Sequence, residues 1–121
     1  MNVVYNEGIV CIDVDGTLVI PDNHPGTREI EIVNPYSGTP AEYRIHHAHV
    51  ELIKTYKGRG NYIRVWSHGG VRWAEAVVKA LKLEDYVDSI ETKPTKLVDD
   101  LPIERIFKTI FLEEDGGEKR K

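Results

Sequence analysis

An apolar run that ends on two carboxylates constrains the fold of this chain more than any other feature. Residues 9–12, Ile-Val-Cys-Ile, continue as Asp13-Val14-Asp15 and turn at once on Gly16-Thr17. A short β-branched run is typical of a strand buried on both faces of a parallel sheet. Two carboxylates one residue apart repel each other and stabilise neither a strand nor a core, so we expect them to bind a cation. The alternative is an ordinary surface turn, because Asp-Gly is a common turn pair.

The rest of the chain alternates helix-like and strand-like segments. Apolar residues at helical spacing predict helices from about 48 to 58 and over 71–83. A second buried strand is predicted over 62–66, and the sequence also favours short strands over 87–91, 97–98 and 106–112. This alternation predicts an α/β fold, a three-layer α/β/α Rossmann-like sandwich around a mostly parallel sheet. Ligands of such sheets bind at the carboxyl ends of the strands, where the two aspartates fall.

A long insertion separates the aspartates from the first predicted helix. Within residues 19–46, two alternating segments over 28–33 and 41–46 predict a β-hairpin flap, preceded by an irregular proline- and glycine-containing stretch. A flap of this size can cover a substrate but cannot form a separate cap domain. Its candidates for substrate contacts are His24, Arg28, Tyr36, Tyr43 and Arg44, although a hairpin packed on the sheet explains these residues equally well.

Composition limits the class of protein. The 121 residues fit one domain, which we place over residues 1–114, with a frayed charged tail over 115–121. The net charge of -4 provides no general attraction to nucleic acid, so a nucleic-acid partner is not favoured. The single cysteine, Cys11, excludes a disulfide framework and favours a reducing cytoplasm. No segment has the pattern of a membrane span or a signal peptide, so we expect no membrane partner.

Polar residues follow the other predicted strands as well. Ser67 follows the strand over 62–66, Lys93 precedes Pro94, and Asp99-Asp100 follow Leu97-Val98. Together with Asp13-Val14-Asp15-Gly16-Thr17-Leu18, these residues resemble the motifs of the haloacid dehalogenase (HAD) superfamily of aspartate-nucleophile phosphohydrolases, of the small-cap type. The resemblance covers about residues 8–112; its first motif is highly specific, and the other three are short.

The resemblance implies a role for each matching residue. Asp13 would be the nucleophile and a metal ligand, and Asp15 the general acid and base, with its backbone carbonyl on the metal. Gly16 and Thr17 would bring backbone N–H groups to the phosphate oxygens. Ser67 would bind a phosphate oxygen through its hydroxyl, with His68 contributing mainly its backbone.

The C-terminal motifs leave alternatives open. Lys93 matches the lysine that stabilises the transferring phosphate, but Lys96 lies three residues away and is a rival for the role. Asp100 would complete the Mg²⁺ site, and Asp99 would bind the metal through water or orient the lysine. For Asp100 alone, a helix N-cap ahead of Leu101-Pro102 is the alternative.

The sequence therefore predicts a Mg²⁺-dependent phosphomonoester hydrolase that acts through an aspartyl-phosphate. The alternatives are a nucleotidase or polynucleotide-end phosphatase, and a non-catalytic metal- or phosphate-binding module on the same scaffold. The substrate would be a phosphorylated small molecule or nucleotide, and a homo-oligomer could cover the open site.

The cluster of His46, His47 and His49 could suggest zinc, but it lacks the i, i+4 spacing of a helical zinc pair, and we interpret it as a hairpin end and helix start.

Overall fold

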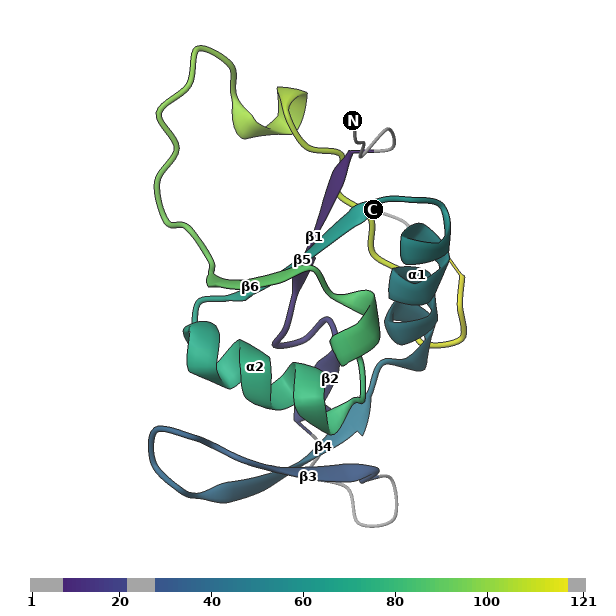
Figure 1. Ribbon diagram of the computed structural model, residues 1–121, viewed down its shortest axis with the longest axis vertical. Helices are drawn as coiled ribbons and strands as arrows, with labels where there is room; N and C mark the ends of the chain where they lie inside the picture. Colours follow the sequence, from purple (N-terminus) through teal and green to yellow (C-terminus); the bar gives the residue numbers. More distant parts are fainter. Residues whose placement is uncertain (1–7, 22–27, 118–121) are drawn as a thin grey trace.

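The chain folds as an α/β structure with two separate sheets (Figure 1). The computed structural model describes residues 8–21 and 28–117. Its first sheet is parallel and three-stranded, with β1 (Ile9–Asp13), β5 (Tyr62–Ser67) and β6 (Ser89–Thr92) in the order β1-β5-β6. Because the three strands are parallel, their carboxyl ends meet at one edge of the sheet.

The predicted flap forms the second sheet, which is antiparallel. Its strands are β2 (Val19–Pro21), β3 (Ile30–Val33) and β4 (Pro40–Ile45), in the order β2-β4-β3. The β3–β4 hairpin agrees with the prediction from alternation over 28–33 and 41–46, and β2 adds a third strand to it.

Two α-helices connect the strands of the parallel sheet. Helix α1 (His47–Gly58) links the flap to β5, and α2 (Val71–Ala80) leads from β5 through the 3-10 turn η1 (Glu84–Tyr86) to β6. Both agree with the predicted helices, but α2 ends three residues early, because Lys82 adopts a left-handed φ of 58° that reverses the chain.

Helix α2 lies between the two sheets and joins them into one core (Figure 1). It contacts β5 and β6 on one side and β3 on the other. Its buried residues pack with apolar side chains from both sheets; the core includes Trp73, Ala74, Val77 and Val78 from α2, Ile63 and Val65 from β5, and Ile32 from β3. The flap is therefore fixed on α2, and removing apolar contacts there would loosen both sheets.

The prediction that the first strand is buried on both faces is wrong, because Ile9 is 52% exposed in β1 and only Ile12 is buried there. The second predicted buried strand, β5, is buried on one face only. Ile63, Val65 and Ser67 are buried, whereas the alternate residues Tyr62, Arg64 and Trp66 are only half-buried. A polar residue such as Arg64 is tolerated on this second face because water and neighbouring carboxylates still reach it; its guanidinium pairs with Glu91 at 2.9 Å.

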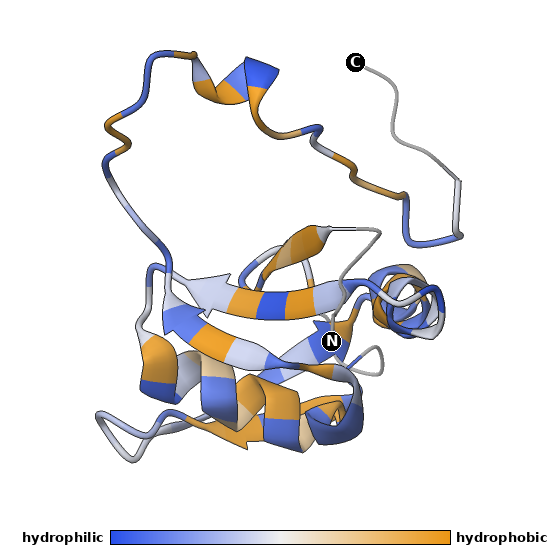
Figure 2. Cartoon of the chain, turned by 45° about the horizontal axis from the view of Figure 1, so that its top comes forward, coloured by the Kyte–Doolittle hydropathy of each residue, from blue (hydrophilic) through white to orange (hydrophobic). Residues whose placement is uncertain are grey.

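The predicted strands over 97–98 and 106–112 are also wrong. From Lys93 to about Ile110 the chain arches away from the sheet and contains only the 3-10 turn η2 (Ile103–Arg105), as Figures 1 and 2 show. Only two apolar residues lie between Lys96 and Asp99, too few to bury a strand, and Val98 is 99% exposed. We call residues 93–114 the C-terminal segment; its exposed apolar residues are Leu97, Val98, Leu101, Ile103, Ile106, Phe107 and Ile110.

The helices of the described residues are short. None of them is long and apolar enough to cross a membrane.

Candidate functional site

The parallel strands bring three of the predicted site residues together. Asp13 is the last residue of β1 and Ser67 the last of β5, while Lys93 directly follows β6. The backbone N–H of Lys93 donates to the Ser67 carbonyl at 2.9 Å, which extends the β5–β6 pairing by one step. The Lys93 side chain therefore starts at the carboxyl ends of the strands, where Asp13 also lies.

Asp13 is held by a cation and a hydroxyl. Lys93 Nζ lies 3.6 Å from Asp13 Oδ1, and Thr17 Oγ1 donates to Asp13 Oδ2 at 3.1 Å. The side chains of Asp13 and Lys93 are each 33% exposed, so the carboxylate remains open to a ligand from solvent. The ammonium group also offsets the repulsion between the two neighbouring aspartates.

Asp15 has a different set of partners. Trp73 Nε1–H donates to Asp15 Oδ1 at 3.1 Å, and Ser67 Oγ donates to Asp15 Oδ2 at 3.3 Å. The Ser67 hydroxyl oxygen in turn accepts the Gly69 N–H at 2.9 Å. Burial, and after it the charge of Asp15, raises the pKa of the Tyr43 hydroxyl. The flap therefore lies close enough to respond electrostatically to this carboxylate.

Trp73 is the site residue that the sequence did not reveal. Helical spacing places Trp73 on the buried face of α2, and the centre of its ring lies 5.8 Å from that of the Tyr43 ring. A buried indole N–H nevertheless requires an acceptor, and that requirement is the one signal in the sequence that could have pointed to Asp15.

The turn after β1 uses its own backbone donors. We call residues 14–19 the strand-end turn. Gly16 has a φ of 78°, which favours glycine, and its N–H donates to Val19 O at 2.9 Å. The Thr17 N–H donates to Val14 O at 3.2 Å. The N–H groups of Gly16 and Thr17 are therefore used within the turn, while the Thr17 hydroxyl lies beside Asp13. That this turn brings backbone N–H groups to phosphate stays a prediction.

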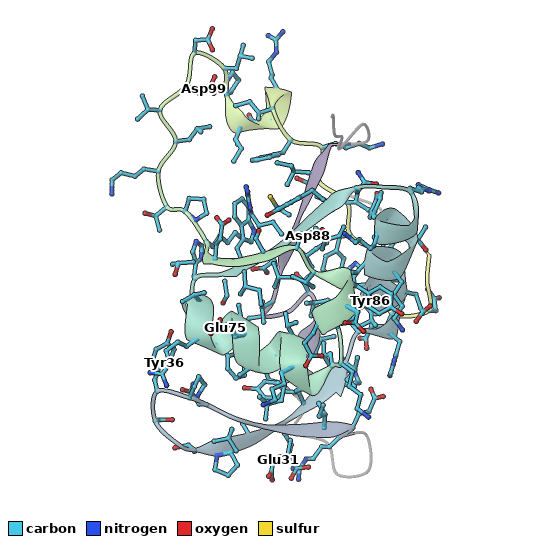
Figure 3. The ribbon with its side chains drawn as sticks, viewed as in Figure 1. Glu31, Tyr36, Glu75, Tyr86, Asp88 and Asp99 are labelled. Carbon is cyan, nitrogen blue, oxygen red and sulfur yellow. The ribbon has the colours of Figure 1, made fainter. Side chains whose placement is uncertain are left out.

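The structure does not bring Asp99 and Asp100 to Asp13. Both are exposed on the arched part of the C-terminal segment, where Figure 3 shows Asp99 far from the sheet. The Asp99 carboxylate instead accepts the Leu101 N–H at 3.0 Å, which lowers the pKa of Asp99. No group of three or more metal-binding side chains occurs in the described residues. The expected placement fails because residues 97–98 do not pair with a strand of the sheet.

The remaining candidates lie around this edge or on the flap. His68 is exposed in the turn between β5 and α2. Tyr36 is exposed at the tip of the β3–β4 hairpin, and its hydroxyl lies so close to Gly70 that a Cβ there would meet it at 2.5 Å. Arg28 pairs with Glu42 at 3.5 Å, and Arg44 pairs with Glu114 at 2.8 Å. His24 lies outside the described residues.

Comparison of the chain with models of known protein families, with curated proteins and with solved structures finds no match. What the chain can do follows from the chemistry at the strand ends. A solvent-accessible carboxylate beside an ammonium group can attack an electrophile whose negative charge the ammonium shields. A second carboxylate two residues away, held by donors, can exchange a proton with that reaction.

Proposed function

We propose that the chain is a Mg²⁺-dependent phosphomonoester hydrolase of the HAD type, acting through an aspartyl-phosphate on Asp13. The observation that carries the proposal is the position of Asp13 at the end of β1, with Lys93 Nζ at 3.6 Å and Asp15 two residues further along the chain. A surface turn would have no need of this lysine, whereas a phosphoryl group arriving at Asp13 needs a cation to shield its charge.

The proposed reaction has two steps. A carboxylate oxygen of Asp13 attacks phosphorus, the bond from phosphorus to the leaving oxygen breaks, and Asp15 gives its proton to that oxygen. Water then attacks phosphorus and transfers a proton to Asp15, and the bond from phosphorus to Asp13 breaks, which releases phosphate. The Ser67 hydroxyl, which the sequence predicts to bind a phosphate oxygen, is fully buried and donates to Asp15 at 3.3 Å, so in this proposal it orients the Asp15 carboxylate.

The donor set at the strand end fits Mg²⁺. This ion prefers oxygen ligands, and one or two carboxylates with substrate phosphate and water suffice to hold it. Asp13 offers an accessible carboxylate, and the backbone carbonyl of Asp15 would be the second protein ligand. When bound, the ion shields the negative charge of the phosphoryl group. Asp99 and Asp100 are left out of this set because the structure places them away from Asp13.

We further propose that the fold is a three-layer α/β/α sandwich. Two α-helices are assigned in the described residues, and the third layer would lie on the half-buried face of β5.

We also infer that the protein is cytoplasmic, since its one cysteine lies in β1 and forms no disulfide.

Metal dependence tests the proposed reaction directly. We expect the full chain to release phosphate from p-nitrophenyl phosphate with Mg²⁺ and to lose this activity in excess EDTA, with recovery when Mg²⁺ is restored. A panel of phosphorylated metabolites, mononucleotides and 5′- and 3′-phosphorylated oligonucleotides would then identify the substrate class. Turnover of no member of the panel, together with phosphate binding by the protein, would favour the non-catalytic module instead.

Replacement of Lys93 by alanine should reduce kcat by about two to three orders of magnitude, because it removes the cation beside Asp13. Lys96→Ala is the matched control and should change kcat less than about threefold, since Lys96 lies on the exposed arch of the C-terminal segment. The measurement is the steady-state rate of both variants at saturating Mg²⁺. If Lys96→Ala is the crippling change, the assignment of the lysine is wrong.

A further inference from the structure

Two stacked histidines connect the strand-end turn to the C-terminal segment. The rings of His46 and His49 lie 3.7 Å apart, centre to centre, with 9° between their planes. His46 is 1% exposed and His49 4% exposed, and the Phe111 ring lies nearly perpendicular to both, with ring centres 5.6 and 4.7 Å away. Buried histidines need partners for both ring nitrogens, and here every ring nitrogen has one.

The partners fix which nitrogen of each ring carries the proton. His49 Nε2 accepts the Leu112 N–H at 2.8 Å, so this nitrogen is unprotonated, and His49 Nδ1 must donate to the Thr17 carbonyl at 2.7 Å. His46 has the opposite arrangement. Its Nδ1 accepts the His49 N–H at 3.2 Å, and its Nε2 donates to the Leu112 carbonyl at 3.0 Å.

The four bonds place both histidines in the neutral form, each as a different tautomer. Burial lowers the pKa of His49, which favours the neutral ring. The stacked pair thus binds both backbone groups of Leu112 and, on its other side, the carbonyl of Thr17. A further backbone bond, from the His46 N–H to Leu18 O at 2.9 Å, holds the next residue of the strand-end turn.

Thr17 is also the residue whose hydroxyl donates to Asp13. The direction of that hydroxyl depends on the backbone of the strand-end turn, and His49 holds this backbone at its Thr17 carbonyl. Arg44 also anchors this part of the C-terminal segment by donating two hydrogen bonds, at 2.8 and 2.9 Å, to Glu114.

We propose that His46 and His49 are positioning residues, which orient Asp13 through Thr17 and connect its orientation to the docking of the C-terminal segment at Leu112. This inference rests on the proposed function, because it assigns Asp13 as the nucleophile. It gives residues 111–114 a role that neither zinc binding nor ordinary helix capping requires.

The first experiment is independent of activity. Long-range ¹H–¹⁵N spectra of the ¹⁵N-labelled full chain at pH 7.5 should show His49 protonated at Nδ1 alone and His46 protonated at Nε2 alone, with the signals assigned from single variants. A reversed tautomer, or a charged ring at either residue, would overturn the proposal even if the protein hydrolyses no phosphate ester.

The second experiment compares two replacements at one position. His49→Phe keeps a flat ring but removes both hydrogen bonds, and we expect kcat to fall roughly tenfold, with little change in KM for the aryl phosphate. His49→Gln keeps one donor and one acceptor on a short amide, so it should restore most of the lost kcat. The amide signals of Thr17 and Leu18 should shift in His49→Phe and return toward their original positions in His49→Gln.

The matched control is His47→Ala. His47 is the neighbouring histidine of α1, but it is exposed and binds Glu29 instead of Leu112 or Thr17. This variant should retain kcat. All rates are compared well below the unfolding midpoint of each variant, so that a loss of stability alone does not reduce them. A wild-type kcat in His49→Phe, or an equal loss in His49→Gln, would contradict a positioning role. A wild-type chain without any activity would contradict the proposed function, and the tautomers and the Thr17 and Leu18 amide shifts would then decide whether the pair holds the strand-end turn.

Discussion

Asp13→Asn is expected to abolish phosphate release, with a fall in kcat of at least roughly three orders of magnitude. An amide is a far weaker nucleophile than a carboxylate, and it is also a poorer ligand for Mg²⁺, so both proposed roles of Asp13 are lost at once. The fold should persist, because the amide oxygen can still accept the Thr17 hydroxyl that Asp13 Oδ2 accepts at 3.1 Å. The measurement is phosphate release at saturating Mg²⁺, together with the thermal unfolding midpoint.

The matched control for this variant is Asp85→Asn. It makes the same chemical change at an exposed residue of η1, which precedes β6 and so lies at the amino end of the parallel sheet. It should keep wild-type kcat. Acid quenching of the wild-type reaction, followed by mass spectrometry of the peptide that contains Asp13, should also detect an added phosphoryl group. Turnover by Asp13→Asn at more than a small percentage of the wild-type rate would exclude the proposed nucleophile.

The parts of the fold that the sequence predicts are those with a clear hydrophobic period. The run Ile9–Ile12 and the segment Tyr62–Trp66 became the parallel strands β1 and β5, and the alternation around Tyr43 became the flap hairpin. The helical spacing over 71–83 became α2, whose buried residues pack in the core that both sheets share. In each case a local pattern already contains the information: a period of two or 3.6 fixes which face is apolar, and a short β-branched run such as Ile9–Ile12 indicates a strand.

The C-terminal segment could not be predicted in the same way. Its apolar residues form runs of no more than three, as at Leu97-Val98 and Ile110–Leu112, and no local period distinguishes a short buried strand from an exposed connection. The strand expected at 97–98 depended on two adjacent apolar residues alone, and the expected position of the two aspartates after it depended on that strand. The consequence was the misplaced Asp99 and Asp100.

Most side-chain contacts within the site could not be predicted from the sequence either. The resemblance to the HAD motifs anticipated the pairing of Lys93 with Asp13, although it left Lys96 as a rival, and parallel topology explains only why both residues lie at the same ends of the strands. The contact of Trp73 with Asp15 needs the rotation of α2 about its axis, and the contacts of His49 need a residue 63 positions later in the chain. Both are tertiary contacts for which the sequence contains only the unsatisfied polar group, never the identity of its partner.

Asp15→Asn is expected to lower kcat by roughly two to four orders of magnitude while the protein keeps its fold and its metal. An amide can neither release a proton to the leaving oxygen nor take one from water, so both proposed steps lose their proton transfer. The fold tolerates the amide because its oxygen can accept the Trp73 N–H while its NH₂ group donates to the Ser67 hydroxyl oxygen. The Mg²⁺ concentration for half-maximal rate should change little, because the proposed ligand from this residue is its backbone carbonyl.

Trp73→Phe tests how much of the effect at Asp15 comes from orientation of its carboxylate and how much from proton transfer. This variant keeps the carboxylate and most of the buried ring but removes the donor to Asp15 Oδ1, so we expect kcat to fall only roughly tenfold. The ranking should therefore be wild type, then Trp73→Phe, then Asp15→Asn, measured as kcat across a Mg²⁺ titration. A proton-transfer role requires that Asp15→Asn be the slower of the two variants by at least about tenfold. If metal affinity collapses in Asp15→Asn while the rate at saturating Mg²⁺ stays high, the carboxylate is a metal ligand and the proton must come from another group.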